Sequence, residues 1–418
     1  MNIHHIAFVD RWVGVPLCWL LTGVRHLGRL LGRERSPDGP PRRICFIKLI
    51  EQGSTVLAAG TLRRAVERVG AENVFFLVFA TNRPILDALE IIPPENVVEV
   101  QAESPWQLAL ELLRAVGRLR RAGIDTTIDL EHFARGTAIL AYLSGAVRRV
   151  GHHRFRNAGG ERGDLLTHRV QYSHYVHASQ SFALLLDVLD HPQGTPPLSK
   201  HPPPPPAAVP SVTPRAEDVA AMRALLGAAA IRPDEHDVIV LNPNASDLIP
   251  LRKWPLDHYV DLGRRLLAAH PGARVIATGT PAEAPNAQAL VRAIDDERAV
   301  SLGGRTTLLQ LLALYTLARV LVTNDSGPAQ FASLIRLPTV VLFGPETPRL
   351  YAPLGERAVV ISAGLACSPC LNVFNHRLSP CRDNVCMQRI GVDEVLAAVR
   401  GLLATARSSD RSATVVAS

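Results

Sequence analysis

The chain has 418 residues, which is long enough for two domains with separate hydrophobic cores. Apolar residues make up 47% of it and charged residues 20%, and this composition excludes a disordered chain. The formal net charge of +7 comes almost wholly from arginine and favours anionic partners, such as nucleotide phosphates or lipid head groups. Aromatic residues are only 5% and no nucleic-acid-binding motif is present, so we expect no nucleic-acid partner.

An apolar segment near the beginning, residues 12–24, is too short to span a bilayer and lacks the cleavage site of a signal peptide. A helix that starts near Pro16 would place apolar side chains on one face and Thr22 and arginines on the other. The apolar positions are Leu17, Leu20, Leu21, Val24, Leu27 and Leu31, and the arginines are Arg25, Arg29 and Arg33. Such a helix suits a membrane interface, although a helix packed on the protein's own core has the same pattern. We expect residues 1–35 to be a membrane-interface segment that holds a cytoplasmic protein to the inner-membrane surface through residues 12–33.

The next region, residues 42–190, reads as an α/β domain. Apolar strands alternate with helices, which predicts a doubly wound parallel sheet. The expected strands are 44–47, 74–79 and 127–130, and the expected helices end near Val69 and span 108–121. Beyond the third strand we find no regular pattern.

A proline-dense segment, residues 191–214, predicts an extended linker. A second α/β domain follows over residues 215–405, and residues 406–418 predict a disordered tail. The expected strands of the second domain are 237–241, 274–278, 320–322 and 339–343, and its expected helices are 256–269 and 308–318. Two doubly wound, Rossmann-like domains of this kind would face each other across a cleft, which suits a transferase with one substrate on each domain.

The loop 323–328 is the strongest candidate for a binding site, because it joins an apolar strand to a helix. Asp325 or Ser326 can cap that helix, and Pro328 suits its first turn. A helix that begins beyond the carboxyl end of a parallel strand is a common place for phosphate groups, so Asn324, Asp325, Ser326 and Gly327 are candidate donor-binding residues. A well-capped helix without a ligand explains the same residues.

Two other loops of the second domain are expected at the same edge of the sheet. After the strand 237–241 come Asn244, Ser246 and Lys253, whose small polar side chains and positive charge suit a phosphate. Glu283 follows the next strand, where its carboxylate can accept hydrogen bonds from a ribose or a base. Taken alone, Glu283 is better explained as a first-turn residue that favours the helix dipole.

These motifs resemble the heptosyltransferase-like glycosyltransferases of family 9. The likeness rests on 324–328 with Leu342-Phe343-Gly344-Pro345, on Trp254-Pro255 and on Cys367-Ser368-Pro369-Cys370 with Cys386-Met387. It implies a GT-B fold, a nucleotide-diphosphate sugar such as ADP-heptose on the second domain, and a lipopolysaccharide-core or lipid-linked saccharide acceptor on the first. It also implies inverting transfer with no metal and no cofactor.

Two positions depart from the family pattern. Ser54 follows Gly53, where the family usually has an aspartate as general base. A serine hydroxyl is a poor base, so we name Glu51 as the substitute, with Asp129, Glu131 and His132 as competitors. Gln330 stands where the family often has a histidine near the diphosphate, and it cannot carry the positive charge of one. Both changes also suit a homologue that binds sugar nucleotides without catalysis and acts as a scaffold.

Further candidates remain open from the residues alone. Cys367, Cys370, Cys381 and Cys386 have a spacing that can bind zinc, but buried reduced thiols or a disulfide fit as well. The turn His152-His153 with Arg154 and Arg156 can meet an anionic acceptor. A serine hydrolase that uses Ser54 or Ser326 lacks the Gly-x-Ser-x-Gly motif.

Overall fold

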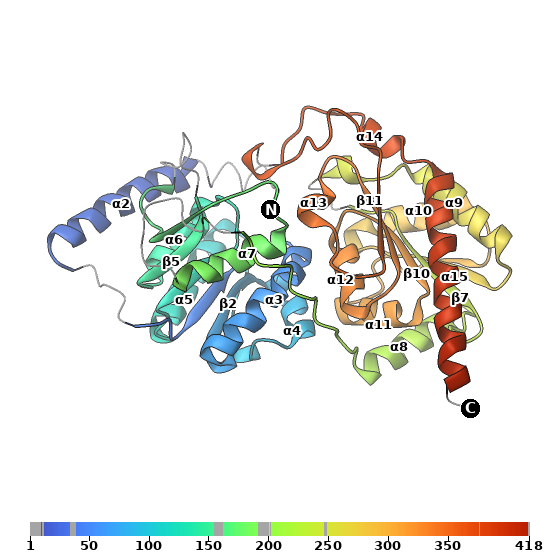
Figure 1. The fold of residues 1–418 in the computed structure, drawn as a ribbon, viewed down its shortest axis with the longest axis horizontal. Coiled ribbons are helices and arrows are strands. Elements are labelled where there is room, and N and C mark those ends of the chain that lie inside the picture. Colours follow the sequence, from blue (N-terminus) through green and yellow to red (C-terminus); the bar gives the residue numbers. More distant parts are fainter. Residues whose placement is uncertain are drawn as a thin grey trace. The chain divides into compact units, whose positions relative to one another are not determined.

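A computed structural model describes residues 10, 12–33, 39–153, 162–190, 200, 202–245, 249–375 and 377–416, with side chains as far as residue 405. The chain divides into two compact units, Met1–Ala208 and Val209–Ser418. Each unit is built on a six-stranded sheet in which every paired strand is parallel to its neighbour, with helices around it (Figure 1). The predicted α/β fold with two doubly wound domains is confirmed.

Unit 1 has the strand order β3-β2-β1-β4-β5-β6 of a dinucleotide-binding fold. Its strands are β1 (Ile44–Ile47), β2 (Val74–Phe79), β3 (Val97–Val100), β4 (Thr126–Asp129), β5 (Arg148–His153) and β6 (His168–Gln171). Its helices are α2 (Gly14–Leu30), α3 (Gln52–Val69), α4 (Arg83–Leu89), α5 (Pro105–Arg121), α6 (Arg135–Leu143) and α7 (Ala178–Asp187). The apolar strands are buried because helices cover a parallel sheet, and α5 and α6 pack on β1 and β2 through one hydrophobic cluster.

Strand β5 corrects two expectations. Residues 148–153 form a fully buried strand, so the pattern of strands and helices continues where we found none. His152 and His153 are therefore not in an exposed basic turn. Burial lowers the pKa of His153 to about 4 and that of His152 well below its usual value, so neither carries a charge for an acceptor. Arg154 and Arg156 lie outside the described residues.

Helix α2 packs against α6 through its smaller and more polar face (Figure 1). The buried positions are Gly14, Cys18, Thr22 and Arg25. Arg25 forms an ion pair with Asp164 at 3.2 Å, and the backbone N–H of Asp164 donates to Thr22 Oγ1 at 2.9 Å. A Cβ at position 14 would lie 2.9 Å from the Cβ of Arg135, so the close approach of α2 needs a glycine there.

The opposite face of α2 is apolar and exposed. Side chains on this face and just beyond the ends of the helix are 52% to 85% exposed, and they are Trp12, Val13, Trp19, Leu20, Val24, Leu27, Leu30 and Leu31. Leu17 and Leu21, which we placed on the same stripe, are half-buried against Cys18 and α6. In the part of the chain that the structure describes, none of the helices has the length and apolar character to cross a membrane.

Unit 2 repeats the topology, with the order β12-β11-β10-β7-β8-β9. Its strands are β7 (Asp237–Asn242), β8 (Ala273–Ala277), β9 (Ala299–Ser301), β10 (Val320–Asn324), β11 (Thr339–Phe343) and β12 (Ala358–Ser362). Its helices are α8 (Ala216–Gly227), α9 (Leu256–Ala269), α10 (Ala284–Ile294), α11 (Leu308–Leu317), α12 (Gly327–Ile335), α13 (Pro348–Tyr351), α14 (Val385–Gln388) and α15 (Val392–Val416). The segment that we predicted to be a disordered tail is therefore helical as far as Val416.

Part of the predicted linker packs on unit 1. Residues 202–206 contain no helix or strand, and the side chain of Gln180 donates to the carbonyl of Pro204 at 2.8 Å. Residues 191–199 and 201 lie outside the described residues. Prolines cannot donate to a ladder or continue a helix, which explains the lack of regular structure in residues 202–206.

Candidate active site

The binding edge of unit 2 lies where strands β7 and β10 are neighbours at the centre of the sheet. The strand order reverses between these two strands, and ligands of open α/β sheets bind outside the carboxyl ends of strands at such a point. Because β8 pairs with β7 and β11 with β10, the loops after all four strands emerge at the same edge. The three loops that we singled out therefore come together as predicted.

The loop after β10 leads directly into α12. Ser326 is the N-cap residue by backbone geometry, but its hydroxyl donates to the carbonyl of Asn324 at 3.1 Å and does not cap the helix. Pro328 lies in the first turn, as predicted. A Cβ at position 327 would lie 3.1 Å from the ring of Phe331, so Gly327 lets the loop pack tightly there. The helix N-terminus keeps backbone N–H groups that have no partner within the helix and favour an anion.

Asn324 and Asn244 hold these loops together. The Asn324 side chain accepts from the backbone N–H of Trp254 at 3.0 Å and donates to the carbonyl of Asn244 at 3.1 Å. Asn244 in turn donates to the carbonyl of Thr278 at 3.0 Å. Both side chains are almost fully buried. Both asparagine side chains therefore belong to the framework that joins these loops.

A buried charged cluster lies beside this framework. The Arg252 guanidinium is 3.7 Å from Asp325 Oδ2, and the Arg377 guanidinium is 3.6 Å from Glu346 Oε1. Burial, with Asp325 nearby, raises the pKa of Glu346 to about 8. Burial also raises the pKa of Asp325, although Arg252 opposes this. Sequence reasoning missed Arg252, Glu346 and Arg377. Arg252 could have been found, because its loop carried other candidates, but Glu346 and Arg377 lie outside such loops.

Gln330 is buried on α12. Its amide nitrogen donates to the carbonyl of Tyr351 at 2.8 Å, while its Oε1 has no hydrogen-bond partner. Arg377 lies over the Tyr351 ring, 5.5 Å from its centroid. Gln330 and the charged cluster are therefore linked through Tyr351.

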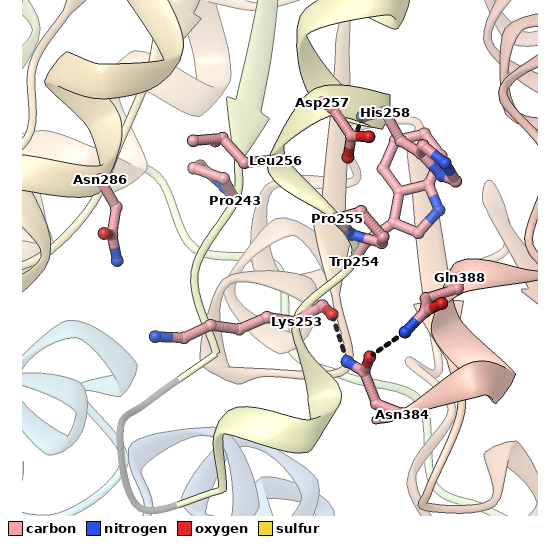
Figure 2. A pocket seen from close by; sticks show the side chains of 10 residues that line it. All are labelled: Pro243, Lys253, Trp254, Pro255, Leu256, Asp257, His258, Asn286, Asn384 and Gln388. Carbon is pink, nitrogen blue, oxygen red and sulfur yellow. Dashed lines mark hydrogen bonds between the residues drawn. The ribbon is translucent and has the colours of Figure 1, made fainter. Parts of the chain in front are cut away.

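A pocket of about 640 Å³ opens next to Lys253, which is within the usual size of small-ligand sites (Figure 2). The Lys253 side chain extends toward the side of the pocket where Asn286 lies, away from Trp254 and His258. The Lys253 carbonyl accepts from Asn384 at 2.9 Å, which fixes the backbone from which this side chain projects.

The other two predicted donor contacts have different outcomes. Glu283 forms a capping box, in which its carboxylate accepts from the backbone and the hydroxyl of Thr280, both at 2.9 Å. This is the structural alternative that we kept for Glu283. Ser246 lies outside the described residues.

The predicted catalytic residues of unit 1 lie at the equivalent reversal of strand order, between β1 and β4. Lys48 Nζ, almost fully buried, is 3.4 Å from Glu51 and 3.0 Å from Glu131. The Ser54 hydroxyl donates to Glu51 Oε2 at 3.0 Å. Glu51 has a positive φ of 72° just before α3, a strained backbone that directs it toward Lys48 and Ser54.

The competitors for the role of base are engaged elsewhere. Glu131 accepts from the backbone N–H groups of Leu49 and Ile50, at 2.9 Å and 3.2 Å, in addition to Lys48. Asp129 is fully buried and pairs with Arg162. Burial, with Lys48 and Arg162 nearby, lowers the pKa of His132 to about 3, and its ring stacks on His152.

The structure gives no support to the serine hydrolase. The hydroxyls of Ser54 and Ser326 bond to Glu51 and to the carbonyl of Asn324, and in the described part of the chain neither is paired with a histidine. All six cysteines are free thiols, and of the clustered four only Cys386 is buried. Among the described residues, no group of three or more histidine, cysteine or carboxylate side chains is arranged to hold a metal.

Several known proteins are similar to this chain in fold and in sequence. Residues 112–377 match glycosyltransferase family 9 (heptosyltransferase). Lipopolysaccharide heptosyltransferase 2 of Salmonella typhimurium is 31% identical over 130 residues, which are 30% of this chain and 36% of that protein. The solved structure of E. coli ADP-heptose lps heptosyltransferase II has a TM-score of 0.67 at 20% identity, covering 87% of this chain and 99% of that one. E. coli heptosyltransferase WaaC with ADP has a TM-score of 0.58 at 16% identity, covering 86% and 99%.

The fold is thus that of the two-domain, GT-B heptosyltransferases. The chain belongs to glycosyltransferase family 9, because the family match spans more than half of its length. The sequence match to the Salmonella enzyme spans little more than a third of that relative's length, 36%.

Proposed function

We propose that this protein is an inverting, metal-independent glycosyltransferase that moves a heptose or related sugar from a nucleotide-diphosphate donor to a lipopolysaccharide-core or lipid-linked saccharide. Family membership supports the reaction class. The observation that carries the proposal is the edge of unit 2, where the start of α12, Arg252 and Lys253 come together beside buried polar atoms without partners. The relative solved with ADP makes ADP the first nucleotide to test.

In this proposal the diphosphate binds to the N-terminus of α12, with Arg252 and Lys253 as its cationic partners. Backbone N–H groups and arginine or lysine side chains stabilise the negative charge that develops on the departing nucleotide. A divalent cation does the same work in other phosphate-leaving reactions, so these groups support a reaction without one.

Glu51 is the proposed general base. Lys48 and the Ser54 hydroxyl both contact its carboxylate and hold it just before the start of α3. Glu51 removes the proton of the acceptor hydroxyl while that oxygen bonds to the anomeric carbon and the nucleotide diphosphate departs. Because this is one displacement, the anomeric configuration inverts. Ser54 serves as a positioning residue for Glu51 and not as the base.

Binding of ADP, UDP and GDP to the purified protein, measured by calorimetry, tests the donor site. Loss of a charge-assisted contact costs about 1.5–3 kcal/mol, so Lys253→Met is expected to weaken binding of the preferred nucleotide about 10- to 100-fold. Lys200→Met, at an exposed position, is the matched control and keeps the wild-type affinity. Failure of all three nucleotides to bind, or equal affinity in Lys253→Met, would contradict the proposed donor site.

Transfer from ADP-heptose to lipopolysaccharide-core acceptors, followed with Glu51→Gln, tests the catalytic part. The variant is expected to bind ADP normally and to lose turnover by a factor of about 100 or more, as expected for removal of a general base. Donor binding by the wild-type protein with no turnover on any acceptor would instead indicate the non-catalytic scaffold.

We also propose that α2 attaches the protein to the cytoplasmic face of the inner membrane. The helix is docked on unit 1 by the face that contains Cys18, Thr22 and Arg25, and this leaves its leucines and tryptophans exposed. An exposed apolar helix face with two tryptophans and nearby arginines suits the interface of an anionic membrane.

Co-sedimentation with vesicles of phosphatidylethanolamine and phosphatidylglycerol tests this attachment. The double substitution Leu20→Glu with Leu27→Glu removes two exposed leucines, each worth about 1.5 kcal/mol or more when buried, so binding should fall on the order of 100-fold. Leu378→Glu changes an exposed leucine of unit 2 and serves as the control. Unchanged sedimentation of the double variant would rule out α2 as the membrane contact.

A further inference from the structure

Helix α5 is apolar on two sides. One side packs on β1 and β2 through a hydrophobic cluster in which Ala115 and Leu119 are buried. On the other side Trp106, Leu110 and Leu113 are 87%, 48% and 65% exposed, and we call these three residues the α5 stripe. Their spacing of four and three residues places them along one line of the helix. A helix that is apolar on both sides is normally covered on both, so the α5 stripe indicates a further contact.

Positive charge gathers at the end of the same helix. Helix α5 contains four arginines and a single glutamate, Glu111, which pairs with Arg114 at 2.5 Å. The side chains of Arg118, Arg120 and Arg121 donate to backbone carbonyls, and in the described part of the chain none of the three pairs with a carboxylate. All three are exposed. Their charge is therefore not neutralised within unit 1, and it suits an anionic surface.

The α5 stripe lies on the same side of the first sheet as α2. Helix α6 packs toward the sheet with Leu140 and Ala141, in the cluster that also contains the buried residues of α5. Its Ala138 and Ile139 instead pack with Cys18 of α2, so α2 lies on the outer side of α6 (Figure 1). Helix α5 is the neighbour of α6, and its stripe points away from the sheet, as the exposed face of α2 does. One surface can therefore meet both apolar faces.

A lipid surface fits the α5 stripe better than another protein does. A stable protein interface buries about 800 Å² on each partner and uses about 20–30 residues a side, and three side chains supply far less. A membrane interface needs no matching surface. It accepts tryptophan and leucine side chains at the head-group boundary, while arginines contact anionic head groups. The α5 stripe with its arginines has this composition, and so has the exposed face of α2.

We propose that the α5 stripe is a second membrane-binding surface, which enters the head-group region of an anionic bilayer together with α2. This inference rests on the membrane attachment proposed for α2 and goes beyond it. A single helix in the interface leaves unit 1 able to tilt about the axis of that helix. A second contact removes this freedom, so the carboxyl edge of the first sheet, with Glu51, keeps one orientation toward the bilayer.

The fluorescence of Trp106 tests the contact directly, because this side chain is part of the α5 stripe. Replacement of Trp12 and Trp19 by phenylalanine keeps the α2 face apolar and leaves only Trp106 and the buried Trp254 as fluorophores. With vesicles of phosphatidylethanolamine and phosphatidylglycerol, the Trp106 emission should shift to shorter wavelength, and lipids with brominated acyl chains should quench it. A further Trp106→Phe substitution should abolish this response. Phosphatidylcholine in place of phosphatidylglycerol should weaken it, because the arginines lose their anionic partners.

Co-sedimentation with the same vesicles is the second measurement. Leu110→Gln with Leu113→Gln removes the apolar groups without adding charge and keeps good helix-forming residues, so vesicle binding should weaken about tenfold or more. Leu378→Gln makes the same change at an exposed leucine of unit 2 and should bind as the wild type does.

The outcomes separate this inference from the attachment through α2. No response of Trp106 to vesicles, or equal binding of the wild type and the double glutamine variant, would overturn the α5 contact while leaving α2 as the attachment. A dimer that the two glutamine substitutions dissociate, with no Trp106 response, would show a second copy on the α5 stripe and overturn the inference as well. Absence of wild-type binding to the vesicles would contradict the attachment through α2, and with it the inference.

Discussion

Replacement of Asn324 by alanine should destabilise unit 2 far more than a usual surface substitution. Asn324 is fully buried and bridges the reversal of strand order through the Trp254 N–H and the Asn244 carbonyl. Without the amide both backbone groups remain buried and unpaired, at a cost of about 1–3 kcal/mol each, or about 2–6 kcal/mol together. The Tyr259 hydroxyl also donates to Asn324 Oδ1 at 3.3 Å, but its loss costs less because the hydroxyl keeps a bond to the Asn242 carbonyl at 3.0 Å.

The chain offers a direct assay for this loss. Trp254 is the only tryptophan of unit 2, and the others, Trp12, Trp19 and Trp106, are exposed. Their replacement by phenylalanine leaves one buried fluorophore that reports the urea-induced unfolding of unit 2. The Trp254 amide should also exchange its hydrogen faster in Asn324→Ala, because its acceptor is gone.

The matched control for this assay is Asn286→Ala. Asn286 is exposed and donates to Asn244 Oδ1 at 3.1 Å, so its loss should cost less than about 1 kcal/mol. A loss below about 1 kcal/mol in Asn324→Ala, with the Trp254 amide still protected from exchange, would refute the framework role of Asn324.

Two further substitutions test the buried charges. Lys48→Met leaves Glu51 and Glu131 facing each other without their common cation, so unit 1 should lose about 3 kcal/mol of stability by urea unfolding; a stability equal to wild type would show that the ion pairs contribute nothing net. For Glu346 the folded-state pKa of about 8 lies above the usual 4.5, so the folded state holds a proton that the unfolded chain releases, and stability falls as pH rises from about 4.5 to 8. Glu346→Gln removes this dependence, so its advantage over the wild type in the free energy of unfolding should grow between pH 5 and pH 8, to on the order of 3 kcal/mol at pH 7. A constant difference would contradict the buried, neutral carboxyl.

The strands predicted from apolar runs are nearly right, because parallel strands covered on both faces need continuous hydrophobic sequence. Strands 44–47 and 74–79 and helix 256–269 match the structure to the residue. Strand β5 was missed since its residues Arg148, Arg149, His152 and His153 are polar. Their burial depends on partners far along the chain, such as the Leu165 carbonyl for Arg149 and Ser181 for His152.

The candidate site shows the same division at the level of single residues. The loop 323–328 was recognisable because the strand, the turn residues and the helix start are adjacent in sequence. The partners of its polar side chains were not recognisable, since Asn324 bonds to two backbone groups while its neighbour Asp325 pairs with Arg252. Glu346 and Arg377 could not be singled out in the sequence, because neither belongs to a motif. Their ion pair, and the position of Asp325 near Glu346, exist only in the folded structure.

The sequence by itself therefore determined the fold class, the family resemblance and the edge of each sheet that carries the candidate residues. These depend on local apolar patterns and on short motifs, which a chain contains before it folds. Only the tertiary structure decided which face of α2 is buried, which asparagines form the framework and which oxygens remain without partners. Those properties depend on which distant groups come within hydrogen-bonding distance, and topology sets that proximity while sequence spacing does not.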